Sequence, residues 1–584
     1  MKKLPLNMTP KFSYITSRER LSSVYEQLRE ERYLFLDTEV SGDQIRLVQV
    51  GGKDEIFILD LFDLGEEGIL FLKRLLSGRG IVGHNLKFDL KYLYAYGIEP
   101  YAVFDTMIAS QLLGDTDKHS LQKVAMHYLG QVLDKGLQAS NWGQPFLGRE
   151  QLEYAALDVK VVRELFHIFL DKLNEHPHRE EVLLKTRTSK VFGLLNPVAI
   201  VEMAFVQETA KLELKGIPVD REELERKLRE QEKLLQKKVM DFMFRYRADP
   251  MSPKQVGELL TKKFGLDLPK TEKGNVSTDD KVLAEHSLHP AVSELLEIRG
   301  LKKTIEKLQE IRDKLRGNRV YPEFKQIGAI TGRMASMNPN VQNIPRNLRS
   351  IFKAEEGKTF VIADFSQIEL KIASEYVGEE KMIQAFLQGR DLHRYTASVF
   401  LGKAEEDITK EERQLAKAVN FGLIYGISAK GLVEYAKTYG VDLSPESAQK
   451  IRDSFFNYYT SIRAWHERVK KELREFKESR GHTLLGRPYI AHTFPDAVNY
   501  PIQGTGADLL KLSVLMFDAE ARRENLKASV VNLVHDEVLV ECEETQAEKV
   551  KEVLERTMKH AGRIVLKQVP VEVEVFVNKR WEKD

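Results

Sequence analysis

The stretch Val361-Ile-Ala-Asp364-Phe-Ser-Gln-Ile-Glu369-Leu370 determines what fold and chemistry this sequence predicts, because it places an aspartate at the end of an apolar strand. Far downstream, two apolar runs flank His535-Asp536-Glu537, a pattern typical of a β-hairpin that presents its acids at the turn. Carboxylates of this kind bind pairs of divalent cations about 3.5–4 Å apart in phosphoryl transfer. We therefore expect Asp364 and Asp536 to bind metal, with Glu537 either binding it directly or supporting the site.

Between these two motifs, a predicted helix carries cations on one face. Arg413, Lys417 and Phe421 recur every four residues, which keeps them on one side of a helix. Basic residues at this spacing usually form a solvated surface, but here the chain continues into the apolar, aromatic and glycine-containing run 420–426. Cations in such a place can neutralise a triphosphate, and we expect this face to bind one.

The amino-terminal third carries a second set of acids. Residues 33–38 predict a buried strand that ends in acid, and strands alternate with helices up to about residue 190, which is typical of an α/β layer. Asp37 and Glu39 share one face of that strand, and Tyr154 and Asp158 lie one helical turn apart. An isolated Asp-x-Glu is a common surface feature. Together with Asp89 the set holds four carboxylates, which would repel one another too strongly to cluster without cations.

Composition sets wider limits on what this protein can be. The 584 residues allow several domains of roughly 150 residues each, and a hydrophobic content of 42% is ample for their cores. A net charge of +1 neither favours nor excludes nucleic acid. A single cysteine excludes an internal disulfide and indicates a reducing compartment, and no apolar run predicts a signal peptide or a membrane span. A charged fraction of 30% is compatible with a heat-adapted protein or with an ordinary charged surface.

In this order, the three motifs and the amino-terminal acids resemble the family A DNA polymerases, the bacterial DNA polymerase I group. The likeness runs from about residue 31 to the end and is greatest to polymerases of deep-branching, Aquificales-like thermophilic bacteria, with phage and plastid versions as alternatives. It implies an α/β chain with a ribonuclease H-like exonuclease domain at 1–190 and a right-hand polymerase domain at 191–584. Within the latter, the resemblance places the thumb at about 220–318, the palm at about 319–374 and 481–584, and the fingers at about 375–480.

The resemblance also assigns roles to residues at two active sites. In the exonuclease, Asp37, Glu39, Asp89 and Asp158 would hold two metals while Tyr154 orients the attacking water. In the polymerase, the catalytic residues would be Asp364, Asp536 and Glu537, with the backbone carbonyl of Phe365 as a further metal ligand. The nucleotide would be bound by Gln367, Glu369, His393, Arg413, Lys417, Phe421 and Tyr425, and DNA by Arg333, Asn340, Gln342, Asn499, Gln503 and His535. Glu369 matches the steric gate against a ribose 2′-hydroxyl, with Tyr425 as its expected hydrogen-bond partner.

The implied activity is template-directed DNA synthesis with 3′–5′ proofreading, in DNA replication and repair. Its cofactors would be two Mg²⁺ per active site, with Mn²⁺ as a substitute, and its partners primer-template DNA and deoxynucleoside triphosphates. We expect a monomer without membrane attachment in the cytoplasm, associated with the nucleoid, or in the host cytoplasm if the source is viral. Because only 36 residues precede Asp37, we also expect the large-fragment arrangement without a 5′-nuclease domain.

Three segments leave the family pattern or its interpretation open. Many relatives have tyrosine where this chain has Phe365, which leaves the backbone carbonyl unaffected. Residues 491–498 stand where many relatives are rich in arginine, so template contacts there are in doubt. A predicted helix near 297–319 is rich in lysine and arginine, and either grips duplex phosphates as part of the thumb or is simply a solvated face.

Three rival interpretations are weaker. A single-subunit RNA polymerase shares the two aspartates and the fingers lysine, but Glu369 would crowd a 2′-hydroxyl and the proofreading set is complete. An exonuclease whose remaining chain only clamps DNA would not need Asp364, Asp536, Arg413 and Lys417. A purely structural DNA-binding protein would have no use for two metal sites.

Overall fold

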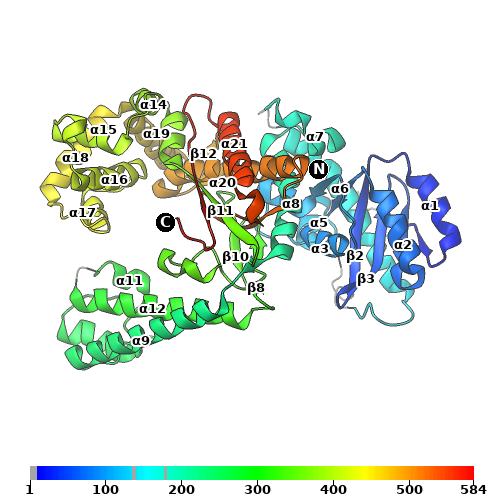
Figure 1. Ribbon diagram of the computed structural model, residues 1–584, viewed down its shortest axis with the longest axis horizontal. Coiled ribbons are helices and arrows are strands. Elements are labelled where there is room, and N and C mark those ends of the chain that lie inside the picture. The colour runs from blue at the N-terminus through cyan, green and yellow to red at the C-terminus, as the bar shows by residue number, and fades with distance from the viewer. Residues whose placement is uncertain (1–9, 134–139, 176–179, 288, 584) are drawn as a thin grey trace.

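The computed structural model describes residues 10–133, 140–175, 180–287 and 289–583. Its amino-terminal region is built on a mixed sheet (Figure 1). Its strand order is β1-β4-β3-β2-β5-β6. Strand β2 lies antiparallel to β3 and parallel to β5. The strands are β1 (Phe12–Ile15), β2 (Tyr33–Ser41), β3 (Gln44–Gly51), β4 (Ile56–Asp60), β5 (Gly80–Gly83) and β6 (Ala102–Asp105). The α/β class predicted from the sequence is confirmed.

Helix α6 (Arg149–Asn174) packs against β2, β3, β4 and β5. Its buried residues, which include Leu152, Ala155, Val159, Val162 and Phe166, recur at the three- and four-residue spacing of an amphipathic helix. This packing brings the sides of the helix, with Tyr154 and Asp158, close to the sheet. The other helices of the region are α1 (Leu21–Leu28), α2 (Leu61–Leu76), α3 (Lys87–Ala95), α4 (Thr106–Leu113), α5 (Leu121–Leu129) and α7 (Arg187–Phe192).

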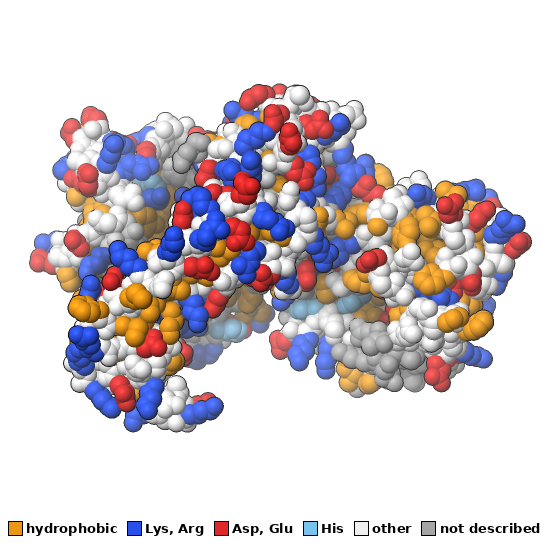
Figure 2. Space-filling view, turned by 60° about the horizontal axis from the view of Figure 1, so that its bottom comes forward, with side chains coloured by type: hydrophobic (Ala, Val, Ile, Leu, Met, Phe, Trp, Pro, Cys, Tyr) orange, Lys and Arg blue, Asp and Glu red, His pale blue; other side chains and the backbone are white. Residues whose placement is uncertain are grey.

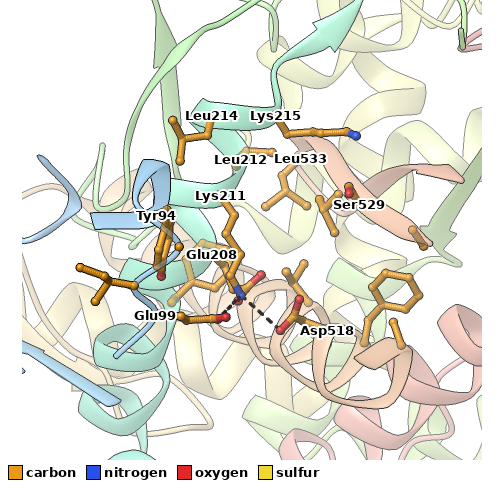
Figure 3. A pocket seen from close by; sticks show the side chains of 18 residues that line it. Tyr94, Glu99, Glu208, Lys211, Leu212, Leu214, Lys215, Asp518, Ser529 and Leu533 are labelled. Atoms are coloured by element: carbon orange, nitrogen blue, oxygen red, sulfur yellow. Dashed lines mark hydrogen bonds and ion pairs between the residues drawn. The ribbon is translucent and has the colours of Figure 1, made fainter. Parts of the chain in front are cut away.

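Helix α8 (Pro197–Lys215) joins this region to the rest of the chain and packs against α3 and β6 on one side and α20 (Phe494–Arg523) on the other. A cavity of about 500 Å³ lies at this junction. A cluster of charged side chains lines it (Figure 3). Lys211 lies 2.6 Å from Glu208, 3.3 Å from Asp518 and 3.6 Å from Glu99. Arg522 also pairs with Glu99, at 2.6 Å. Ion pairs therefore connect the amino-terminal region to the carboxy-terminal one.

The carboxy-terminal region centres on an antiparallel sheet with strand order β14-β15-β11-β16. Its strands are β14 (Ala528–Val534), β15 (Glu537–Glu543), β11 (Lys358–Phe365) and β16 (Val573–Asn578). The predicted strand before Asp364 and the predicted hairpin around Asp536 are both present. Glu537 is the first residue of β15, so it belongs to the strand and not to the turn. Helices α13 (Ile368–Val377), α20 and α21 (Ala547–Val565) complete this core.

A set of helices forms one arm above this sheet (upper left in Figure 1). It contains α14 (Glu380–Leu387), α15 (Leu392–Leu401), α16 (Lys410–Ile424), α17 (Ala429–Lys437), α18 (Pro445–Tyr458) and α19 (Thr460–Phe476). The short hairpin of β12 (Ser479–His482) and β13 (Pro488–Ala491) leads back to α20. Helix α15 packs on α16 and α18, and the buried apolar residues of α16, α18 and α19 are continuous with the core of the sheet region.

A second arm (lower left in Figure 1) consists of α9 (Arg221–Tyr246), α10 (Pro253–Glu258), α11 (Asp280–Ala284) and α12 (Pro290–Asp313). The strands β7 (Ile217–Pro218) with β8 (Arg319–Val320), and β9 (Glu323–Lys325) with β10 (Ala335–Met337), lie at its base. Lys and Arg side chains are spread over its surface (Figure 2).

The prediction of a basic helix at 297–319 is wrong at the carboxy-terminal end, because α12 ends at Asp313. Arg319 lies beyond it and is buried, with its guanidinium 2.6 Å from Glu355 and 2.9 Å from Glu541, so it cannot grip a phosphate. On the helix itself, Lys303 pairs with Asp280 and Lys302 lies 3.9 Å from Glu306. Both lysines stay exposed, so these pairs leave the thumb and the solvated-face interpretations open.

Candidate active sites

The palm-type site lies where β11 ends beside the β14–β15 hairpin. Asp364 stands opposite Glu537 in the β11–β15 register, and the Phe365 N–H donates to the Asp536 carbonyl at 3.4 Å. His535 has a φ of 57°, the left-handed conformation that lets the chain reverse within a two-residue turn. Burial raises the pKa of Asp536 to about 7, and the negative charge of Asp364 adds to this effect. The structure thus places the two predicted metal-binding aspartates in one site.

Glu537 is held by the protein on both of its oxygens. The indole of Trp581 donates to Oε1 at 2.6 Å, and the Arg349 guanidinium lies 3.3 Å from the same atom. The Lys583 ammonium lies 2.6 Å from Oε2 and also pairs with Asp364. Of the two roles left open by the sequence, these contacts favour support of the site over direct metal binding.

Glu369 lies in the first turn of α13, just after Gln367, whose φ of 50° is a strained left-handed conformation. The Tyr425 hydroxyl donates to Glu369 Oε2 at 2.6 Å, which confirms the expected hydrogen bond. Arg333 donates to the other carboxylate oxygen at 2.9 Å. Two donors from distant segments therefore fix the orientation of this carboxylate.

Helix α16 carries three of the seven predicted nucleotide-binding residues, and Tyr425 is its C-cap. Arg413 lies 2.8 Å from Asp391, the N-cap of α15, and Lys417 lies 5.9 Å from the ring of Tyr439. The ring of Phe421 lies 6.0 Å from that of His393. The three residues share one helix as predicted, but the charged groups of Arg413 and Lys417 are turned toward neighbouring side chains.

His393 is only 2% exposed, which differs from the open position that a phosphate contact requires. The Asn420 amide lies 3.0 Å from its Nδ1. Burial lowers the pKa of His393 to about 4, so its imidazole is neutral at pH 7. A phosphate contact by this residue remains a prediction that requires movement of α15 or α16.

Four of the six predicted DNA-contact residues line one cavity of about 180 Å³ beside the β14-β15-β11-β16 sheet: Arg333, Asn340, Gln342 and His535. Within it, Gln342 donates to the Leu533 carbonyl at 2.7 Å and accepts from the Ser336 N–H at 2.8 Å. The other two, Asn499 and Gln503, are bonded to each other at 3.2 Å on α20. The amide of Gln342 is therefore already occupied by protein groups, and its DNA contact stays a prediction.

The predicted exonuclease residues, which lie on β2, α3 and α6, line an open cavity of about 790 Å³: Asp37, Glu39, Asp89, Tyr154 and Asp158. Thr38, which the sequence did not single out, donates to Asp89 at 2.6 Å. Burial raises the pKa of Asp37 to about 7 and that of Asp158 to about 8. Burial and then the charges of Asp37, Asp158 and Asp89 raise the pKa of Glu39. The structure therefore brings these carboxylates into one mutually repulsive cluster.

Both clusters have donor chemistry that suits a hard divalent cation, which prefers oxygen ligands. In the palm-type site, Asp364 Oδ1 is buried without a hydrogen-bond partner among the described residues. Within the same described ranges, no three carboxylate, imidazole or thiolate groups converge as a ready metal cage. The carboxylates therefore fit Mg²⁺ by chemistry, and their side chains must reorient to enclose it.

Sequence reasoning missed several residues of the palm-type site, among them Arg349, Trp581 and Lys583. Each reaches the site from a segment without a recognisable motif. The one available signal was the position of an aromatic and a basic residue directly after the last strand, in Trp581-Glu-Lys583. That pattern alone predicts no contact with a carboxylate far away in the chain.

Comparison with protein families identifies both regions of the chain. The family model described as DNA polymerase family A matches residues 220–583, and the family model described as 3′–5′ exonuclease matches residues 12–174. The chain is also similar to a solved structure described as the POL domain of Pol1 from M. smegmatis in complex with DNA primer-template and dNTP. The TM-score is 0.79 at 23% identity, covering 97% of this chain and 99% of that one, which supports the fold.

Curated relatives show the same similarity in sequence. The chain is 60% identical to a DNA polymerase I of Aquifex aeolicus (strain VF5) over 98% of this chain and 100% of the relative. It is 30% identical to the DNA polymerase I of Borreliella burgdorferi over 98% of this chain and 64% of the relative. It is 31% identical to the DNA polymerase I of Chloroflexus aurantiacus over 86% of this chain and 54% of the relative. The chain thus spans the whole of the Aquifex relative and about half to two thirds of the other two.

Proposed function

Because the chain belongs to the family A DNA polymerases and carries a 3′–5′ exonuclease domain, we propose that it extends a DNA primer at Asp364 and Asp536 and proofreads at the Asp37 cluster. The observation that carries this proposal is the β11–β15 register, which sets Asp364 beside the hairpin that bears Asp536. Two Mg²⁺ ions bound in each site would activate the attacking oxygen and stabilise charge on the transferring phosphoryl group.

The side chains of the fingers and palm would then position the nucleotide. Arg413 and Lys417, on α16, supply positive charge for the triphosphate once Arg413 leaves Asp391. Glu369, fixed by Tyr425 and Arg333, occupies the volume that a 2′-hydroxyl would need. We further propose that the enzyme acts as a monomer on primer-template DNA and deoxynucleoside triphosphates. No described helix is long and apolar enough to cross a membrane.

Separation of the two activities tests the proposal. We expect Asp37→Ala with Glu39→Ala to reduce 3′ degradation at least about a hundredfold, as when one electrostatic group of a transition-state site is removed. The same variant should extend primers at nearly the parent rate, because the two clusters lie in different regions of the chain. Asp536→Ala should have the opposite effect. Both rates are measured on one labelled primer-template, with and without nucleotides.

Asp43→Ala is the matched control, because Asp43 is exposed in the turn that follows β2. It should retain both activities. A folded Asp37→Ala, Glu39→Ala variant that lost primer extension as well would contradict the assignment of two independent sites.

A further inference from the structure

The carboxy-terminal segment after β16 is anchored over the catalytic end of the palm sheet. Arg580 donates to the Ser350 carbonyl at 2.6 Å and to Asp220 at 2.7 Å. Trp581 is 1% exposed, and its ring lies 5.4 Å from that of Phe352. Arg580 and Trp581 therefore fix the backbone just before Lys583.

Lys583 extends from this anchor into the carboxylates. Its ammonium pairs with Asp364 Oδ2 and lies 2.6 Å from Glu537 Oε2. Of the described residues, Lys583 is the one whose side-chain cation forms an ion pair with Asp364. An intrinsic positive charge thus bridges the acid expected to bind metal and the acid that supports it.

The same contacts show why this charge can exchange. The Lys583 side chain is 26% exposed, whereas that of Glu537 is 5% exposed, so the lysine approaches from the solvent side. A lysine is a point charge on a flexible four-carbon stem, and it can leave one partner without moving the backbone. The anchored Trp581 would stay in place during such a movement, because its indole is bonded to the other oxygen of Glu537.

We propose that Lys583 is a built-in counter-ion of the polymerase carboxylates: it occupies Asp364 in the DNA-free enzyme and leaves it when a divalent cation binds. The inference rests on the proposed function of Asp364. It agrees with the orientation of Asp364, whose Oδ2 is turned to Lys583. Its consequence is that free metal binds weakly to this site until the lysine is displaced.

The experiment measures Mn²⁺ binding to the DNA-free full-length chain by electron paramagnetic resonance, with MnCl₂ as the only ligand. All proteins carry Asp37→Ala and Glu39→Ala, so that the exonuclease cluster does not contribute. We expect Lys583→Met to bind Mn²⁺ at least about tenfold more tightly, because a hydrogen bond to a charged partner no longer has to be broken. Lys579→Met is the matched control, since Lys579 is in the same segment but pairs with Glu544.

A second measurement uses the unsubstituted lysine and does not depend on a variant that folds. The rate of Lys583 acetylation by an amine-reactive reagent is followed by peptide mass spectrometry, with and without MnCl₂. We expect Mn²⁺ to accelerate acetylation of Lys583 and to leave that of Lys579 unchanged. This outcome would show directly that the ammonium leaves its carboxylates.

Equal or weaker Mn²⁺ binding by Lys583→Met than by Lys579→Met would overturn the proposal. So would acetylation of Lys583 that does not respond to Mn²⁺. Failure of the proposed function has a different signature: an Asp364→Asn variant would bind Mn²⁺ as well as its parent. In that case Asp364 binds no metal, and the counter-ion role falls with it.

Discussion

Replacement of Glu369 by alanine should admit ribonucleotides. The carboxylate cannot simply rotate aside, because Tyr425 donates to it at 2.6 Å and Arg333 at 2.9 Å. Forcing an extra group into a packed site costs about 1–3 kcal/mol. At about 1.4 kcal/mol per tenfold, removing that barrier should raise the relative use of a ribonucleotide roughly 5- to 150-fold.

The assay compares kcat/KM for a deoxynucleotide and its ribonucleotide analogue on one primer-template. The parent, Glu369→Ala and Glu369→Gln are measured side by side. Glutamine keeps the volume and can still accept the Tyr425 hydrogen bond, so its discrimination should stay close to that of the parent. Thermal unfolding of each protein establishes that the loss of the Arg333 pair has not unfolded the site.

Two outcomes would refute this reasoning. Equal discrimination by Glu369→Ala and the parent would mean that another residue excludes the 2′-hydroxyl. If Glu369→Gln relaxed discrimination as much as Glu369→Ala, the charge of the side chain and not its volume would be responsible.

Two other substitutions test helix α16 and the junction at helix α8. Phe421→Tyr adds a hydroxyl that can donate a hydrogen bond to a phosphate, which is worth about 1.5–3 kcal/mol. The ratio of kcat/KM for a dideoxynucleotide to that for the deoxynucleotide should therefore rise roughly ten- to a hundredfold. An unchanged ratio would show that Phe421 does not lie beside the nucleotide. Burial raises the pKa of Glu213, but the Lys87 charge and hydrogen bonds from Lys87, Lys91 and the Phe324 N–H lower it below its ordinary 4.5. The stability from this depressed pKa is therefore present above about pH 4.5 and lost below it. Glu213→Gln should lower Tm at pH 7, with a smaller deficit near pH 3.5; a deficit independent of pH would contradict this.

Local sequence patterns by themselves determined the elements that carry the two sites. Apolar runs bounded by acids predicted β11 and the β14–β15 hairpin, and four-residue spacing predicted the shared helix of Arg413, Lys417 and Phe421. These predictions succeed because the side-chain period of a strand or helix depends on neighbours in the chain. The resemblance, in turn, correctly anticipated the hydrogen bond between Glu369 and Tyr425.

Only the tertiary structure decided which partners these side chains have. Lys583 pairs with Asp364 across 219 positions, and Arg319 with Glu541 across 222. Periodicity could not show that His393 is buried, because it identifies the faces of a helix but not which of them meets a neighbouring helix. Contacts between distant segments depend on how whole elements pack. Lys583 reaches Asp364 and Glu537 from a segment that is fixed by the buried Trp581.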